Sequence, residues 1–153
     1  MKKIFVLLFL ICLSNCTSLD VFEKEKIECP KITSPHGSEE LILDTINKTK
    51  TYIGLRGIKK NCFKKNSLIM MDLEVNVRVI RRDYKIDDNI EVTLSLVSID
   101  KSEKEYDRDD FHANFFLKEN NKIVEIISDM SVEVPVNGSV LLGLYQKQSK
   151  SYY

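Results

Sequence analysis

The sequence has little of what would indicate a helical protein, a serine hydrolase or a nucleic-acid-binding protein. Its only alanine is Ala113, and no long segment repeats apolar residues at the helical period of about 3.6. It contains no G-x-S-x-G motif, which places a nucleophilic serine in many hydrolases. Basic and acidic residues balance at 23 each, so no excess of positive charge favours nucleic acid.

Histidine is also scarce, and its placement argues against a metal site or a catalytic triad. His36 lies in the turn-like sequence SPHGS, and His112 lies in a segment of alternating apolar residues. A metal site needs several ligands that converge, and no Cys/His spacing supplies them. A triad of His112 with Asp109 or Asp110 and a serine is the enzymatic alternative, which no nucleophile motif supports. We therefore expect surface histidines, no cofactor and no catalysis.

Two acidic segments, YKIDDN (84–89) and EYDRDDFH (105–112), raise the question of calcium binding. Calcium loops combine several oxygen ligands with a sharp turn, often made by glycine. Neither segment contains glycine, and Lys85 and Arg108 interrupt the negative charge. We interpret both segments as solvated hairpin loops.

The first sixteen residues, MKKIFVLLFLICLSNC, predict export. Lys2 and Lys3 precede an apolar run from residue 4 to residue 13. As a helix, such a run spans about 15 Å, half of the hydrocarbon thickness of a bilayer, so it is too short for a stable membrane span. A basic start followed by a short apolar core is typical of a secretory signal.

The sequence Leu13-Ser14-Asn15-Cys16 resembles the lipobox of bacterial lipoproteins, although Asn15 departs from the usual Gly or Ala. This resemblance implies a diacylglycerol thioether on Cys16, cleavage before Cys16, and an acylated N-terminus that carries palmitate or a similar chain. Two or three acyl chains would anchor the protein firmly, whereas one chain holds only marginally. Thr17 follows where an aspartate would retain an enteric lipoprotein in the inner membrane. We therefore expect the periplasmic face of the outer membrane, with the inner membrane as the alternative.

Removal of residues 1–15 leaves 138 residues (153 − 15) with a net charge of −2 (21 − 23), enough for one domain. We assign residues 16–28 to the lipidated N-terminus and a polar tether, 29–148 to the folded domain and 149–153 to a tail. Cys29 and Cys62 are the only cysteines of this domain, and an exported protein meets oxidising conditions, so we predict a disulfide between them. The segments around Cys29-Pro30 and Cys62 also loosely resemble small envelope lipoproteins of alphaproteobacteria, a group that implies no activity.

Alternating apolar residues predict strands through most of the domain. From Ile69 to Val79 every odd position is apolar, and the same period of two recurs near Ile90–Leu96, Phe111–Leu117, Val124–Val134 and Val140–Leu144. Gly54 and Gly57 suggest a bulge within a strand over 52–58. Residues 39–47 fit either a short helix or a strand with a turn. This spacing predicts an all-β protein, an antiparallel, immunoglobulin-like β-sandwich of about seven strands.

A cluster of basic residues surrounds Cys62 and is the one candidate contact surface in the sequence: Arg56, Lys59, Lys60, Lys64 and Lys65. Such a cluster could meet anionic lipid headgroups or a polyanionic glycan, at about 1 kcal/mol per charge near a membrane. A solvated face is the simpler interpretation. Taken together, we expect a lipid-anchored, non-catalytic interaction or assembly module that binds another envelope protein. The alternative is a carrier of a lipid or other apolar ligand, which would need a barrel with an internal cavity.

Overall fold

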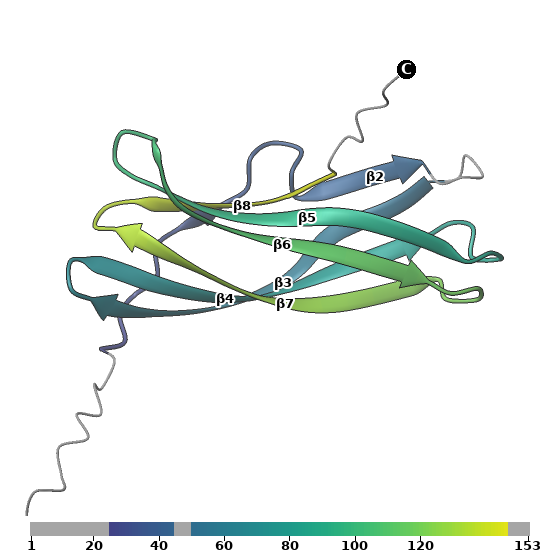
Figure 1. Ribbon diagram of the computed structural model, residues 1–153, viewed down its shortest axis with the longest axis horizontal. Coiled ribbons are helices and arrows are strands. Elements are labelled where there is room, and N and C mark those ends of the chain that lie inside the picture. Colours follow the sequence, from purple (N-terminus) through teal and green to yellow (C-terminus); the bar gives the residue numbers. More distant parts are fainter. Residues whose placement is uncertain (1–24, 45–49, 147–153) are drawn as a thin grey trace, which may run out of the picture.

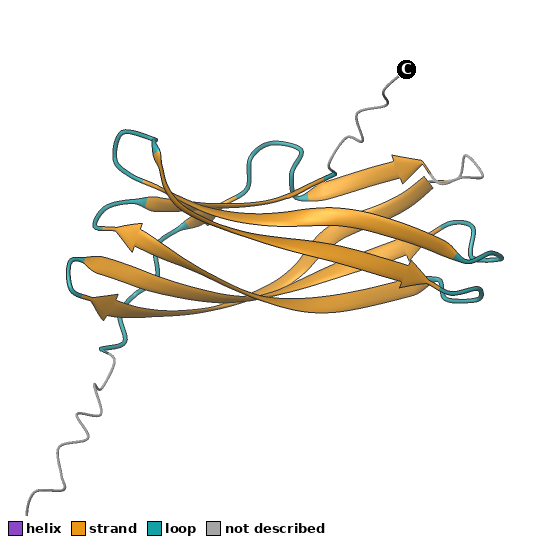
Figure 2. Cartoon of the chain, in the orientation of Figure 1, coloured by secondary structure: helices purple, strands orange, loops and turns teal. Residues whose placement is uncertain are grey.

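The computed structural model describes residues 25–44 and 50–146, and all regular structure in these residues is strand (Figures 1 and 2). Eight strands stack as two layers whose long axes run nearly side by side. Their bounds are β1 Ile32–Thr33, β2 Glu40–Asp44, β3 Lys50–Lys65, β4 Leu68–Arg81, β5 Asp88–Ile99, β6 Glu105–Leu117, β7 Ile123–Pro135 and β8 Ser139–Tyr145.

The two layers are four-stranded sheets, which confirms the predicted β-sandwich with one strand more than expected. Sheet A has the order β2-β3-β4-β7 and is entirely antiparallel. Sheet B has the order β1-β8-β5-β6, in which only the two-residue β1 runs parallel to its neighbour. An immunoglobulin constant domain places its strands in the orders 1-2-5-4 and 3-6-7, so the strand order here is different.

Strand β4 lies in the centre of sheet A, and its alternating side chains show how the period of two in the sequence builds the core. Its inward side chains from Met71 to Val79 are at most 2% exposed, whereas the charged residues between them face outward. Sheet B contributes Leu94, Leu96 and Phe115 to the same apolar cluster. Burial of a side chain of this size stabilises the fold by about 1.5–3 kcal/mol, so the space between the sheets is the main source of stability.

The predicted irregularity in the 52–58 strand is present in β3. The register against β4 shifts between Leu55 and Gly57, which makes a β-bulge at Arg56. Of the segment 39–47, residues 40–44 form strand β2, paired with residues 50–54 of β3, and residues 45–47 lie outside the described residues.

The interpretation of residues 105–112 as a hairpin loop is wrong, because they form the first half of strand β6. The carboxylate of Asp107 accepts the Glu133 backbone N–H at 2.8 Å, and that of Asp109 accepts the Ser131 N–H at 2.8 Å. Both donors belong to β7, the edge strand of the other sheet. These two bonds occupy part of the β7 edge, and inward-pointing charges are a known protection of edge strands.

On the opposite side, the segment before β2 links the sheets. The Ser38 carbonyl accepts the Leu144 N–H of β8 at 2.7 Å, and the Glu39 carbonyl accepts the Leu55 N–H of β3 at 3.2 Å. A Cβ added to Gly143 would lie 2.8 Å from the Ser38 side chain, so glycine allows this close approach. His36 and Gly37 form the preceding turn, as predicted, and Gly37 has a φ of 79°.

The start of the described chain is fastened to the end of β3. Cys29 and Cys62 form the predicted disulfide, with a Cα–Cα distance of 5.3 Å. Before it, the Ile27 N–H donates to the Cys62 carbonyl and the Lys64 N–H donates to the Glu25 carbonyl, both at 3.1 Å. Pairing with sheet A therefore already includes residues 25–27, which we assigned to the tether from the sequence.

A buried arginine joins the loops at the other end of the sandwich. Arg81 is 1% exposed, and its guanidinium donates to the carbonyls of Leu117 and Lys118 at 3.1 and 3.0 Å and also to that of Ile86. It thereby connects the β4–β5 loop with the end of β6. The polar sequence around Arg81 is typical of a turn. Arg81 nevertheless continues the row of inward-facing odd positions of β4.

Candidate functional site

Strand alternation divides the basic cluster around Cys62. Lys59 and Lys65 point to the outer face of sheet A, where they form ion pairs with Glu74 at 2.6 Å and Glu133 at 2.8 Å. The hydrogen bond that each lysine donates to its carboxylate raises the pKa of that lysine. These pairs are exposed, so each contributes little to stability.

The other cations of the cluster lie apart from these pairs. Lys60 and Lys64 stand opposite Leu73 and Ile69, on the other side of β3, and form no ion pair with any described residue. Arg56 lies at the bulge and lowers the pKa of Glu125 only as a minor cause. The five basic residues therefore do not form a single patch.

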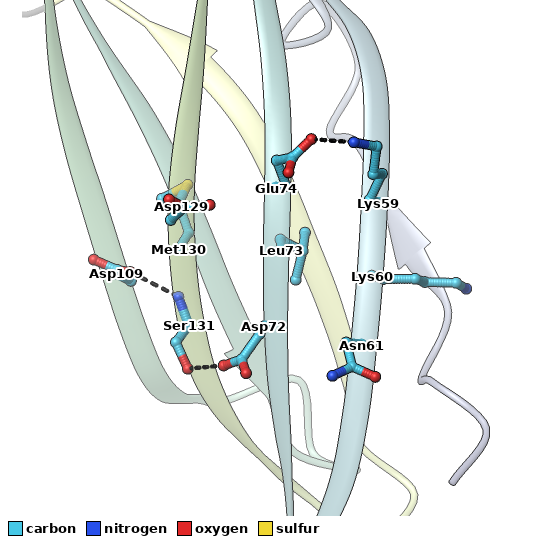
Figure 3. Close-up of a pocket in the computed structure, with 10 residues that line it drawn as sticks. All are labelled: Lys59, Lys60, Asn61, Asp72, Leu73, Glu74, Asp109, Asp129, Met130 and Ser131. Atoms are coloured by element: carbon cyan, nitrogen blue, oxygen red, sulfur yellow. Dashed lines mark hydrogen bonds and ion pairs between the residues drawn. The ribbon is translucent and has the colours of Figure 1, made fainter. Parts of the chain in front are cut away.

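A shallow groove of about 570 Å³ crosses the outer face of sheet A at Asp72, beside the Lys59–Glu74 pair (Figure 3). In this groove the Ser131 hydroxyl donates to Asp72 at 2.8 Å, and the Ser131 N–H donates to Asp109. Lys60 points away from the groove in Figure 3. The described residues contain no group of three or more His, Cys, Asp or Glu side chains placed to hold a metal ion.

The two histidines lie at the surface, as predicted. The Nδ1 of His112 lies 3.0 Å from the hydroxyl of Thr93. On the same face of sheet B the Ser95 hydroxyl donates to Asp110 at 2.5 Å, but no hydrogen bond among the described residues joins His112 to Ser95, Asp109 or Asp110. Asp109 faces the other way, toward β7.

A polar network on the outer face of sheet B was not found from the sequence. Arg108 donates to both carboxylate oxygens of Glu105, at 2.9 and 2.7 Å, and also to the Ser95 hydroxyl at 2.7 Å and to Asp110 at 3.4 Å. The hydrogen bond from Arg108 lowers the pKa of Glu105, and the same bond raises that of Arg108. This network covers Ser95 and Val97, which are at most 9% exposed although they belong to the outer face.

An apolar row was also missed, because it is assembled from four separate strands of sheet A. Ile42 of β2 is the cross-strand neighbour of Tyr52, Tyr52 of Ile80, and Ile80 of Ile123. Ile42 is 51% exposed and Ile123 is 53% exposed. The guanidinium of Arg82 lies 5.6 Å from the centre of the Tyr52 ring, a cation–π distance. We call Ile42, Tyr52, Ile80 and Ile123 the distal row.

The distal row is far from the place where the N-terminal segment meets the sheet. Residues 25–29 join β3 at Cys62, while the distal row crosses it at Tyr52, ten residues away (62 − 52). At about 3.3 Å per residue the separation is roughly 33 Å. Figure 1 shows the described N-terminal residues at the lower left and β2 at the upper right.

Cys16 and the signal segment lie outside the described residues. Within 25–44 and 50–146 there is no helix long and apolar enough to cross a membrane. No family model, curated protein or solved structure matches this chain.

Proposed function

We propose that the protein is a lipid-anchored, non-catalytic module of the bacterial envelope that holds or assists another envelope protein. The acyl chains on Cys16 hold it to the membrane. The contact with its partner lies at the end of the sandwich that carries the distal row.

The observation that carries this proposal is the position of the Cys29–Cys62 disulfide. It fixes the chain that leads back to Cys16 at the end of β3 beside the β3–β4 turn, with a Cα–Cα distance of 5.3 Å. The distal row, with Ile42 and Ile123 more than half exposed, lies roughly 33 Å farther along the sheet. Exposed apolar side chains at an end directed away from the bilayer are suited to a protein partner.

The core supports an interaction module over a carrier of apolar ligands. Residues such as Val75, Leu96 and Phe115 meet between the sheets in one continuous apolar cluster. The grooves lined by described residues are open at the surface, and each includes polar or charged side chains, such as Asp72, Arg108 and Glu91. A carrier would need an enclosed apolar cavity of about 300–1,000 Å³.

A photo-crosslinking experiment in intact cells tests this arrangement. A photoreactive amino acid replaces Ile123 in one strain and Ser67 in another; both residues are exposed, Ile123 in the distal row and Ser67 in the β3–β4 turn. We expect a protein adduct of one defined mass from position 123 and mainly lipid adducts from position 67. The reverse pattern, or lipid adducts from both positions, would contradict the proposed orientation.

A further inference from the structure

Among the described residues, strand β2 has a free edge whose backbone groups can be assigned from the register. The Leu55 N–H donates to the Glu39 carbonyl, so residues 39 and 55 form a hydrogen-bonded pair of the antiparallel ladder. Such pairs alternate, which directs the N–H and C=O groups of Leu41 and Leu43 toward β3. The corresponding groups of residues 40, 42 and 44 therefore point away from the sheet.

Within the described chain, strand β8 hydrogen-bonds to the segment on this side only up to Ser38, just before β2 begins. The Ser38 carbonyl, on the same side of the strand, accepts the Leu144 N–H at 2.7 Å. From residue 40 to residue 44, β2 pairs with β3 alone among the described strands. An edge of this kind is a template for an additional strand.

The charge of the β2 segment itself is one-sided, and the nearest cross-strand cation is Lys50 of β3, which stands opposite Asp44. The segment EELILD, residues 39–44, carries three carboxylates and no basic side chain. Glu40 and Asp44 flank Ile42 on the exposed face and form no ion pair with any described residue. Two copies of β2 paired antiparallel about Ile42 would place Glu40 opposite Asp44, which like-charge repulsion disfavours.

We infer that the free edge of β2 binds an extended segment of a partner protein by strand addition. The segment carries an apolar residue opposite Ile42 and a lysine or arginine two positions before and after it. This apolar residue extends the distal row across a fifth strand, and the basic residues meet Glu40 and Asp44. The inference deepens the proposed function and rests on it for the identity of the partner as an envelope protein.

Peptide binding to the full-length, ¹⁵N-labelled protein in detergent micelles tests the chemistry of this edge. The probe is the blocked peptide KTITK, and ETITE is its charge-matched control. We expect KTITK to shift the amide signals of Glu40, Ile42 and Asp44 most strongly and to bind at least about fourfold more tightly than ETITE, since opposite charges in neighbouring strands attract. Equal binding of the two peptides, or shifts centred on another strand, would overturn the inference.

Two variants separate the edge from a general effect of charge. The double variant Glu40→Lys with Asp44→Lys should reverse the preference in favour of ETITE. The variant Ile42→Pro removes an N–H that points away from β3, so the sheet should persist, as its other amide signals will report, while KTITK no longer binds. A folded Ile42→Pro variant that still binds KTITK at this edge contradicts strand addition.

Crosslinking from position 42 in cells identifies the occupant. Sequencing of the adduct should reveal a partner segment with the basic–x–apolar–x–basic pattern. Adducts to residues 147–153 of this chain or to a second copy of it would overturn the inference in favour of those occupants. The peptide tests do not involve the membrane, so their failure leaves the crosslinks from positions 67 and 123 as an independent test of the proposed function.

Discussion

At the residue scale, the side chain that matters most and was least visible in the sequence is Arg81. The inward row from Met71 to Val79 could be predicted because buried and exposed positions alternate strictly in a strand. The same rule continues to Arg81, but a charged residue before a polar loop indicates an exposed turn. Its burial depends on carbonyls of Ile86, Leu117 and Lys118, and no local pattern shows that these come together.

Arg81→Ala should lower the free energy of unfolding by about 3 kcal/mol or more, because it leaves buried carbonyls without a donor. Arg82→Ala is the neighbouring control. Arg82 is exposed, and its contact with Tyr52 is a cation–π contact at the surface, so its loss should cost at most about 1 kcal/mol. Urea unfolding followed by circular dichroism measures both values. Equal stability of the two variants would contradict the role assigned to Arg81.

Glu125 should titrate below its usual pKa of about 4.3 in the folded protein. The hydrogen bond from Asn76 is the largest cause of the lowered pKa, followed by that from Arg78. A lowered folded pKa means that this contribution to stability is present above the unfolded pKa and is lost as the pH falls through the folded pKa. Carbon-13 NMR of the side-chain carboxyl measures the midpoint, which Asn76→Ala should raise. A midpoint that Asn76→Ala leaves unchanged would show that this bond is absent in solution.

At the scale of elements, the strands were predictable and their closure into a sandwich was not. The strands that contain Ile69–Val79 and Val140–Leu144 follow from the alternation of apolar residues. We expected strand β6 to start at Phe111, but it starts six residues earlier, at Glu105. Its charged first half was misread because Asp107 and Asp109 bond to β7, which is distant in the sequence.

Replacing Asp107 and Asp109 together with alanine should free part of the β7 edge. Each lost bond should lower stability by about 1 kcal/mol, a modest value because water reaches the exposed Ser131 amide. The freed edge should also promote self-association, which sedimentation velocity detects. The double asparagine variant is the matched control, since an amide oxygen can still accept both N–H groups. Self-association of the asparagine variant to the same degree would point to charge rather than to these bonds.

The Cys29–Cys62 bond could be predicted from the number of cysteines and the predicted export alone. The structure adds that the bond joins residues 25–29 to the end of β3. Replacing both cysteines with serine should lower the free energy of unfolding by about 2–5 kcal/mol. The strands far from β3 should form as before, because their pairing does not involve residues 25–29. Unfolding of the wild type with and without reductant measures the same loss. A reductant that leaves wild-type stability unchanged would show that the bond does not form.

At the scale of the whole molecule, the sandwich could be predicted from the sequence, but the proposed interaction surface could not. The basic residues around Cys62 are close together in the sequence. In the structure, alternation along β3 places Lys59 and Lys65 on one side of the strand and Lys60 and Lys64 on the other. The distal row shows the opposite case. Its four residues are scattered from 42 to 123 in the sequence and become neighbours only when β2, β3, β4 and β7 pair. The proposed function depends on the anchor at one end and this row at the other.

The most direct test of the account compares Cys16→Ser with Cys12→Ser by fractionation of cells in high salt. The two cysteines lie four positions apart in the same signal, yet only Cys16 occupies the lipobox position. The account predicts that Cys12→Ser remains in the membrane fraction with attached acyl chains, while Cys16→Ser loses them and leaves that fraction. Retention of Cys16→Ser in salt-washed membranes would contradict the lipid anchor and, with it, the proposed orientation of the sandwich.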